Sequence, residues 1–204
     1  TFNLLAFKTM SEQAAFSLNV NGIHLAGGNS NDVYGNILEM NFAYTGINSN
    51  NSDANDINNN NLSLLGNNKT RSIGIHSSTD ERVYENTILG ATGPEAFGVF
   101  ADGASMLKAE CNALLDIEEA ISVLNNTTAS RFRGNELSNH DFGFRLENSL
   151  IGQQTHHGNL FMTDGITDID AIEMDPIEVQ GSQFIYDKAE NPLFEPFNPI
   201  SPNG

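Results

Sequence analysis

A cluster of basic, acidic and imidazole side chains is the part of the sequence best suited to chemistry. Arg131 and Arg133 are two residues apart, so on a β-strand they point to one side while Phe132 points to the core. The other members of this polar patch are His140, Asp141 and Arg145. Hydrolysis of a glycosidic bond needs two carboxyl groups that converge to about 5–10 Å, and the sequence offers few such pairs. We therefore interpret the patch as a solvated outer face and predict no catalytic residue.

Oxygen-rich stretches make calcium the most plausible metal ion. Residues 49–61 and 163–170 concentrate Asn, Asp, Ser and Thr, and Ca²⁺ takes about six to eight oxygen ligands. Neither stretch matches the EF-hand loop or the glycine-rich calcium-binding nonapeptide. We favour solvated loops and expect no cofactor; if one calcium ion binds, its predicted ligands are Asp164, Asp168 and Asp170.

Other metal-ligating residues are sparse. Cys111 is the only cysteine, so neither an internal disulfide nor a cysteine-based metal site can form. We expect it to serve as a small buried hydrophobe. His156 and His157 are adjacent and would point to opposite faces of a strand, which disfavours a shared ligand set.

The charge balance excludes several classes of partner. The 204 residues include only 9 Lys and Arg and carry a net charge of −17, so nucleic acid and anionic membrane surfaces are disfavoured. No stretch approaches the roughly 20 apolar residues of a membrane span, so we predict no membrane insertion. An acidic, Asn-rich, Lys-poor chain without Trp indicates a protein that works outside the cell.

These side chains are carried on a repeat with two landmarks. The first is an asparagine at steps of 24, 26, 26, 23 and 24 residues: Asn36, Asn60, Asn86, Asn112, Asn135 and Asn159. The second is a small residue that precedes an apolar strand and is expected at a tight bend: Gly22, Gly46, Gly74, Gly98, Ala120 and Gly143. Both landmarks stay in phase through six units, so the repeat sets the architecture.

Each unit has about three short stretches with period-2 alternation, which predicts strands. Residues 114–124 could pass for a helix, but the repeat phase at Ala120 favours a strand. Units of 22–28 residues with three strands fit the coils of a parallel β-helix, stacked about 4.8 Å apart. Leucine-rich repeats would need a different consensus, and propeller blades need about 40 residues. We predict an asparagine ladder at the corners, because Asn tolerates left-handed dihedrals and its amide can hydrogen-bond along the stack.

The pattern resembles the repeats of the right-handed parallel β-helix family, the pectate-lyase-like superfold. Its positions in the first unit are Gly22, Ile23, Leu25, Asn31, Val33, Gly35, Asn36 and Ile37, and the pattern recurs at Gly74, Ile75, Val83, Asn86 and Ile88. The resemblance covers about residues 20–162 and implies an all-β solenoid of about six to seven coils. It does not imply one function, because this superfold hosts lyases, glycosidases, epimerases and non-catalytic surface proteins. The closing stretch is similar in style to the ends of β-helix domains in large bacterial proteins exported by the type IX route.

We divide the chain into an N-terminal coil or cap (1–19), the coils (20–162) and a C-terminal last strand, cap and Pro-rich tail (163–204). The start at Thr1 indicates a processed chain or a segment of something longer. Within the tail, Leu193, Phe194 and Phe197 are predicted to contact the coil end, a neighbouring domain or another subunit.

We therefore predict a non-catalytic, extracellular or cell-surface module of a larger bacterial assembly, with a structural or adhesive role and contacts to surface glycans. The alternative is a carbohydrate-active enzyme, a polysaccharide lyase or glycoside hydrolase, or a remnant of one. A converged set of Arg, Asp and His with surface aromatic residues on one face would favour the enzyme.

Overall fold

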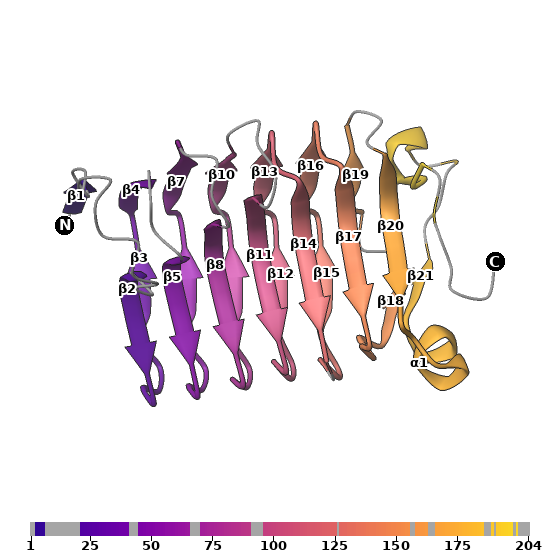
Figure 1. The fold of residues 1–204 in the computed structure, drawn as a ribbon, viewed down its shortest axis with the longest axis horizontal. Helices are drawn as coiled ribbons and strands as arrows, with labels where there is room; N and C mark the ends of the chain where they lie inside the picture. Colours follow the sequence, from indigo (N-terminus) through magenta and orange to yellow (C-terminus); the bar gives the residue numbers. More distant parts are fainter. Residues whose placement is uncertain are drawn as a thin grey trace, which may run out of the picture.

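The computed structural model describes residues 3–6, 21–40, 45–65, 70–90, 96–125, 127–155, 158–162, 166–185, 189, 191–197 and 199. In these residues the chain winds as a parallel β-solenoid, with the short strands of successive coils side by side along one long axis (Figure 1). The predicted all-β parallel β-helix is confirmed. Strand β14 (Glu119–Leu124) covers most of the stretch that could have passed for a helix.

Three parallel sheets run along the solenoid. The first has seven strands: β1 (Asn3–Ala6), β4 (Asn36–Met40), β7 (Asn61–Leu64), β10 (Thr87–Leu89), β13 (Ala113–Leu115), β16 (Glu136–Ser138) and β19 (Leu160–Phe161). The second also has seven: β2 (Asn21–Ala26), β5 (Thr45–Asn50), β8 (Thr70–His76), β11 (Ala96–Asp102), β14, β17 (Phe142–Glu147) and β20 (Thr167–Ile172). The third has five: β3 (Asp32–Tyr34), β6 (Asp56–Asn58), β9 (Arg82–Tyr84), β12 (Lys108–Glu110) and β15 (Arg131–Arg133).

Five coils contribute a strand to all three sheets within the described residues: coil 1 (β2–β4), coil 2 (β5–β7), coil 3 (β8–β10), coil 4 (β11–β13) and coil 5 (β14–β16). The prediction of about six to seven coils is therefore slightly high. The difference arises after coil 5, where β18 (Gln153–Thr155) pairs with β21 (Gln183–Ile185) in a separate two-stranded sheet. The strands β17, β19 and β20 continue the two longer sheets without a complete third side.

Alternating burial explains why these segments form strands. Along β4 the residues are alternately buried and exposed, with Leu38 fully buried and Ile37 on the outside. Equivalent positions in successive coils stack in register, so Ile47, Ile73 and Val99 form one fully buried row inside the second sheet. A single coil would leave these side chains in water, and stacking removes them from it. The core is one continuous cluster from Val33 to Met174.

The second-landmark residues lie within the second-sheet strands and not ahead of them, and close approach of the next coil requires a glycine at four of these positions. A Cβ on Gly98 would lie 2.4 Å from the backbone oxygen of Ala120 and 2.4 Å from Cδ2 of Leu114. A Cβ added to Gly22, Gly46 or Gly143 would likewise lie 2.6, 2.7 or 2.6 Å from a backbone oxygen of the next coil.

The prediction was wrong for Gly74. The register pairs Gly74 with Asn48 and Phe100, two residues beyond the column of Gly98, where Ser72 stands instead. A two-residue shift preserves which side chains face the core, so the sequence pattern alone did not reveal it.

The described end segments extend the sheets further than the sequence indicated. Strand β1 pairs with β4 before the first complete coil, and β20 adds a seventh strand to the second sheet. Helix α1 (Pro176–Gly181) follows, capped by Asp175, whose side chain accepts the N–H groups of Ile177 and Glu178. Strand β21 and the short 3₁₀ helix η1 (Pro192–Phe194) complete the C-terminal end.

Candidate functional site

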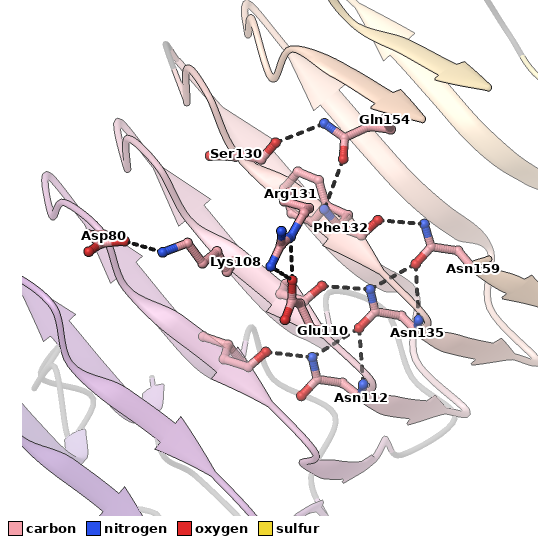
Figure 2. A network of polar contacts seen from close by, with 12 residues as sticks. Asp80, Lys108, Glu110, Asn112, Ser130, Arg131, Phe132, Asn135, Gln154 and Asn159 are labelled. Atoms are coloured by element: carbon pink, nitrogen blue, oxygen red, sulfur yellow. Dashed lines mark hydrogen bonds and ion pairs between the residues drawn. The ribbon is translucent and has the colours of Figure 1, made fainter. Parts of the chain in front are cut away.

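The predicted ladder asparagines lie buried at one corner of the solenoid, where each contacts the next. Figure 2 shows Asn112, Asn135 and Asn159 of this ladder. Nδ2 of Asn112 donates to Oδ1 of Asn135 over 3.0 Å, and the backbone N–H of Asn112 donates to the same oxygen over 3.1 Å. Nδ2 of Asn112 also donates to the backbone oxygen of Val83 over 2.9 Å. The paired donation to the next asparagine recurs for Asn36, Asn60, Asn86 and Asn135. The ladder therefore satisfies buried amide groups that would be costly to leave unpaired.

The residue directly before each ladder asparagine adopts the left-handed conformation at this corner. The positive φ angles are at Gly35 (67°), Asn59 (53°), Glu85 (55°), Cys111 (55°), Gly134 (61°) and Gly158 (56°). The expectation that the ladder asparagines themselves would take this conformation was wrong, because their side chains must point inward while the preceding residue makes the bend. The same geometry exposes Cys111, which corrects its prediction as a buried residue.

A second row of polar side chains lies at the corner between the second and third sheets. Oδ1 of Asn55 accepts from the backbone N–H and Nδ2 of Asn31, over 2.8 and 2.9 Å. Nδ2 of Asn55 donates to Oε1 of Glu81 over 2.9 Å. Glu81 is fully buried, and its Oε2 has no hydrogen-bond partner among the described residues. Burial raises the pKa of the Glu81 carboxyl to about 7, against the opposing effect of the bonds from Asn55 and Ser49.

The structure does not bring the predicted polar patch together. Arg131 and Arg133 lie on β15 of the third sheet with Phe132 fully buried between them, and Arg131 forms an ion pair with Glu110. Arg145 lies on β17 of the second sheet. The buried His140 contacts Asp168, with Nε2 2.7 Å from Oδ1, while Asp141 is exposed. Arg131 and Arg133 therefore lie on a different surface from Arg145, because the two sheets face different directions, and His140 lies on no surface because it is buried.

A different set of side chains converges on the outer surface of the second sheet, which we call the β2–β20 face. Its members stand in two columns of register-paired residues. One column holds Arg71, Phe97, Glu119 and Phe142, and the other holds Gly74, Phe100, Ser122, Arg145 and Asp170. Successive residues of a column come from successive coils. Cations, rings and carboxylates therefore alternate along the solenoid axis at steps of about 4.8 Å.

Arg145 is the centre of the C-terminal half of the β2–β20 face. Its Nη1 lies 2.7 Å from Oε1 of Glu119, and its Nε lies 3.8 Å from Oδ2 of Asp170. The guanidinium carbon also lies 5.0 Å from the ring centroid of Phe142. Oγ of Ser122 donates to the other oxygen of Glu119 over 2.7 Å. Both carboxylates are almost fully buried, so the Arg145 charge offsets their desolvation.

Arg71 and three rings form the N-terminal half of the same face. The Arg71 guanidinium carbon lies 3.6 Å from the centroid of Phe100 and 5.9 Å from that of Phe97. The Phe97 and Phe100 rings meet edge to face at 5.7 Å, and His76 lies 5.5 Å from Phe100. Burial and then the Arg71 charge lower the pKa of His76, while Asp102 acts in the opposite direction. The rings of Phe97 and Phe142 remain half-exposed.

Two of the three residues predicted for calcium, Asp168 and Asp170, already have protein partners. Asp168 is buried and accepts from the backbone N–H of Phe197 as well as contacting His140. Asp170 faces Arg145. Asp164 lies outside the described residues, as do His156 and His157. Within the described residues the predicted calcium set is therefore not assembled.

Two of the three predicted tail residues, Phe194 and Phe197, lie against the end of the solenoid of the same chain. The backbone N–H of Asp168 donates to the oxygen of Phe197 over 3.0 Å. The Phe194 ring lies next to Gly158, and a Cβ added to this glycine would be 3.4 Å from the ring. Phe194 also lines a small cavity of about 20 Å³, together with Phe161 and Phe184. Leu193 and Phe197 keep 39% and 44% of their surface exposed, which leaves apolar area for a further contact.

Several site residues were missed by sequence reasoning. Backbone register places Asn3 opposite Asn36, in the same column as the ladder. The row Asn31, Asn55 and Glu81 advances by 24 and 26 residues, the same first two steps as the ladder, and the shared spacing could have revealed it. On the β2–β20 face the residue type changes from each coil to the next, so only the register identifies its columns.

The fold and its stacked polar corners define a parallel β-solenoid protein. The chain belongs to the NosD family, described as periplasmic copper-binding proteins, whose model matches residues 6–168. Searches of curated proteins and of solved structures found no match to the chain.

The described residues do not form the copper site that the family description implies. Copper in proteins is held mainly by His, Cys and Met side chains. Within the described part of the chain, no group of three or more His, Cys, Asp or Glu is placed to hold a metal ion. His24 contacts Asn48, His76 contacts Asp102, and His140 contacts Asp168. The described part of the chain also has no helix long and apolar enough to cross a membrane.

Proposed function

We propose that this protein is a non-catalytic β-helix module that acts outside the cytoplasm and binds a polysaccharide along the β2–β20 face. The family description as periplasmic supports the location. The stacked coils supply a rigid rod, which suits a structural or adhesive module in a secreted or surface-attached bacterial assembly. A polysaccharide ligand is inferred from the alternation of rings and charged groups along the β2–β20 face.

Sugars present both apolar C–H faces and hydroxyl groups, and this face offers partners for both. Phe97 and Phe142 are half-exposed and two coils apart, so each can stack on a different sugar of one chain that lies along the axis. Arg145, on the strand of Phe142, is partly exposed and can donate to hydroxyl or carboxylate groups. Asp102, on the strand of Phe97, is also partly exposed and can accept from hydroxyl groups. A linear glycan parallel to the solenoid axis satisfies this spacing.

Binding is tested by affinity electrophoresis in gels that contain xylan, β-glucan or polygalacturonate. We expect retardation by at least one of them, and a loss of about thirtyfold in affinity for Phe97→Ala with Phe142→Ala, because stacking contributes on the order of 1 kcal/mol per ring. The control is Arg133→Ala, which lies on the third sheet and should leave the affinity unchanged. Absence of retardation by all three polysaccharides, or equal loss in the control, contradicts the proposal.

A carbohydrate-active enzyme is the second candidate, and one arrangement favours it. Glu119 and Asp170 flank Arg145 from the coils before and after it, so the two strands are about 9–10 Å apart across Arg145. Two carboxyl groups at such a separation, with a guanidinium cation between them, suit action on a glycosidic bond. Incubation with the same polysaccharides, followed by measurement of new reducing ends and of unsaturated products, separates the candidates. Turnover by the wild type that Arg145→Ala abolishes would establish an enzyme.

A further inference from the structure

The outer surface of the third sheet, which we call the β3–β15 face, has its charges sorted by sign along the solenoid. One register column begins with Asp32 and Asp56 in coils 1 and 2, passes Arg82 in coil 3, and ends with Lys108 and Arg131 in coils 4 and 5. The chain has only 9 Lys and Arg, yet this face holds four of them when Arg133 is included. The face is therefore acidic at one end and basic at the other.

A second column on the same face is also asymmetric. Tyr34 in coil 1 is 56% exposed, and Arg133 in coil 5 is exposed without an ion pair among the described residues. Asn58 and Glu110 occupy coils 2 and 4, and Tyr84 occupies coil 3 at the midpoint. The Tyr34 ring at one end of this column can stack on the guanidinium group of Arg133 at the other end. The Asn58 amide can likewise donate a hydrogen bond to the carboxylate of Glu110.

We propose that two copies of this chain pair through their β3–β15 faces, with the order of coils reversed between them. The symmetry axis would lie in the interface, parallel to the strands, so that coil 1 of each copy faces coil 5 of the other and coil 3 faces coil 3. Such an isologous contact uses one surface twice, so the surface must complement itself. Asp32 then faces Arg131, Asp56 faces Lys108, and Tyr34 faces Arg133. In the middle, Tyr84 and Arg82 each face their own copies, and Asn58 faces Glu110. Arg82 keeps its ion pair with Asp56 of its own chain, which reduces the repulsion between the two Arg82 side chains.

The basic side chains are already held in place for this contact. Figure 2 shows Lys108 bonded to Asp80 and Arg131 bonded to Glu110, and Nη1 of Arg82 lies 3.4 Å from Asp56. Three stacked cations on neighbouring strands repel one another within one chain. Carboxylates from a second copy reduce that repulsion, and the intrachain bonds lower the entropy cost of ordering the long side chains.

A polyanion fits this face less well than a second copy. Three of the four cations already contact carboxylates, and a polyanion that extends along the axis would meet Asp32 and Asp56. The net charge of −17 opposes pairing of two copies, but at about 0.15 M salt charges more than about 8 Å apart are largely screened, so local complementarity decides. Because five strands of three residues give a small contact area, we expect a weak dimer that high salt dissociates.

Sedimentation velocity from about 10 μM to about 1 mM protein in about 0.15 M NaCl tests the proposal. The wild type should form dimers in a concentration-dependent way and lose them in about 1 M NaCl. The double variants Asp32→Lys with Asp56→Lys, and Lys108→Glu with Arg131→Glu, should each dimerise at least about tenfold more weakly. An equimolar mixture of the two should restore the dimer, because every reversed charge then meets an opposite one.

The control is Glu39→Lys with Glu136→Lys on the first sheet, which changes the net charge as much as the double aspartate variant does. This control should dimerise at least as well as the wild type. A wild type that stays monomeric throughout, or a mixture that stays monomeric, overturns the proposal. Binding of polygalacturonate that Lys108→Glu with Arg131→Glu abolishes, in a monomeric wild type, assigns the face to a polyanion instead. Circular dichroism melting of each variant establishes that the fold is intact.

Discussion

Nδ2 of Asn55 donates a hydrogen bond to Oε1 of Glu81 over 2.9 Å, at the end of a buried row of polar side chains. The other carboxyl oxygen of Glu81 has no hydrogen-bond partner among the described residues. Glu81 occupies the position in coil 3 that Asn31 and Asn55 occupy in coils 1 and 2. A side chain that can be charged therefore continues a row of amide side chains. Burial favours the protonated acid, which still accepts the bond from Asn55.

Glu81 makes the stability depend on pH. Its pKa is about 7 in the folded protein and near 4.5 when exposed, so below pH 4.5 both states are protonated and there is no penalty. Between about pH 4.5 and 7 the unfolded chain loses the proton while the folded chain keeps it, and the free energy of unfolding decreases. Glu81→Gln, which mimics the protonated acid, should raise that free energy by about 1–3 kcal/mol at pH 8 and change it little at pH 4.

Urea unfolding of wild type and Glu81→Gln at a series of pH values measures this difference. The matched control is Glu85→Gln, an exposed residue four positions later in the same coil, which should give no pH-dependent difference. If the difference between wild type and Glu81→Gln is the same at pH 4 and pH 8, Glu81 does not titrate as described.

Removal of a ladder asparagine should destabilise the fold. Asn60→Leu and Asn112→Leu each leave buried donors and acceptors on two neighbouring coils unpaired, so we expect a loss of about 2–4 kcal/mol each. Thermal and urea unfolding measure the loss. Asn61→Leu is the control, because Asn61 follows Asn60 directly but points outward and is exposed. Equal effects at Asn60 and Asn61 would show that the ladder contributes nothing specific.

A larger side chain at Gly98 should be costly because the next coil is too close. Gly98→Val places carbon atoms within 2.4 Å of the Ala120 oxygen, so the coils must separate, at a cost of about 2–4 kcal/mol. Ser72→Ala in the same column should be nearly neutral, since the Ser72 hydroxyl is buried without a partner among the described residues. Melting temperatures of both variants check this, and a wild-type melting temperature for Gly98→Val would refute the close approach.

The pair of His140 and Asp168 should hold the C-terminal tail on the last coil. Asp168→Ala leaves His140 buried without its partner and removes the acceptor for the Phe197 N–H. We expect the protein to lose about 2–4 kcal/mol of stability, and hydrogen exchange at residues 191–197 to accelerate. The control is Asp141→Ala, an exposed carboxylate next to His140. Unchanged exchange in the tail of Asp168→Ala would show that this pair does not hold it.

The sequence by itself determined the solenoid and its asparagine corners. Asn36 to Asn159 recur at 23–26 residues because each coil must place the same buried amide above the last, so the spacing is visible in one dimension. The alternation of apolar residues in the same units determined which side chains form the core. These features depend on the repeat alone, and the repeat is a property of the sequence.

Only the tertiary structure decided the exact register and the composition of the outer faces. Gly74 fits the alternation of inward and outward residues, although it lies two residues away from the column of Gly46 and Gly98. A two-residue shift leaves the same side chains facing the core, so the pattern does not reveal it. Arg145 contacts Glu119, 26 residues earlier, and Arg71 packs on Phe97 and Phe100, 26 and 29 residues later. The residue type at each of these register positions changes from one coil to the next. Outward side chains are not constrained by the stacked core. Their neighbours are therefore set by how the coils align, which the sequence pattern does not specify.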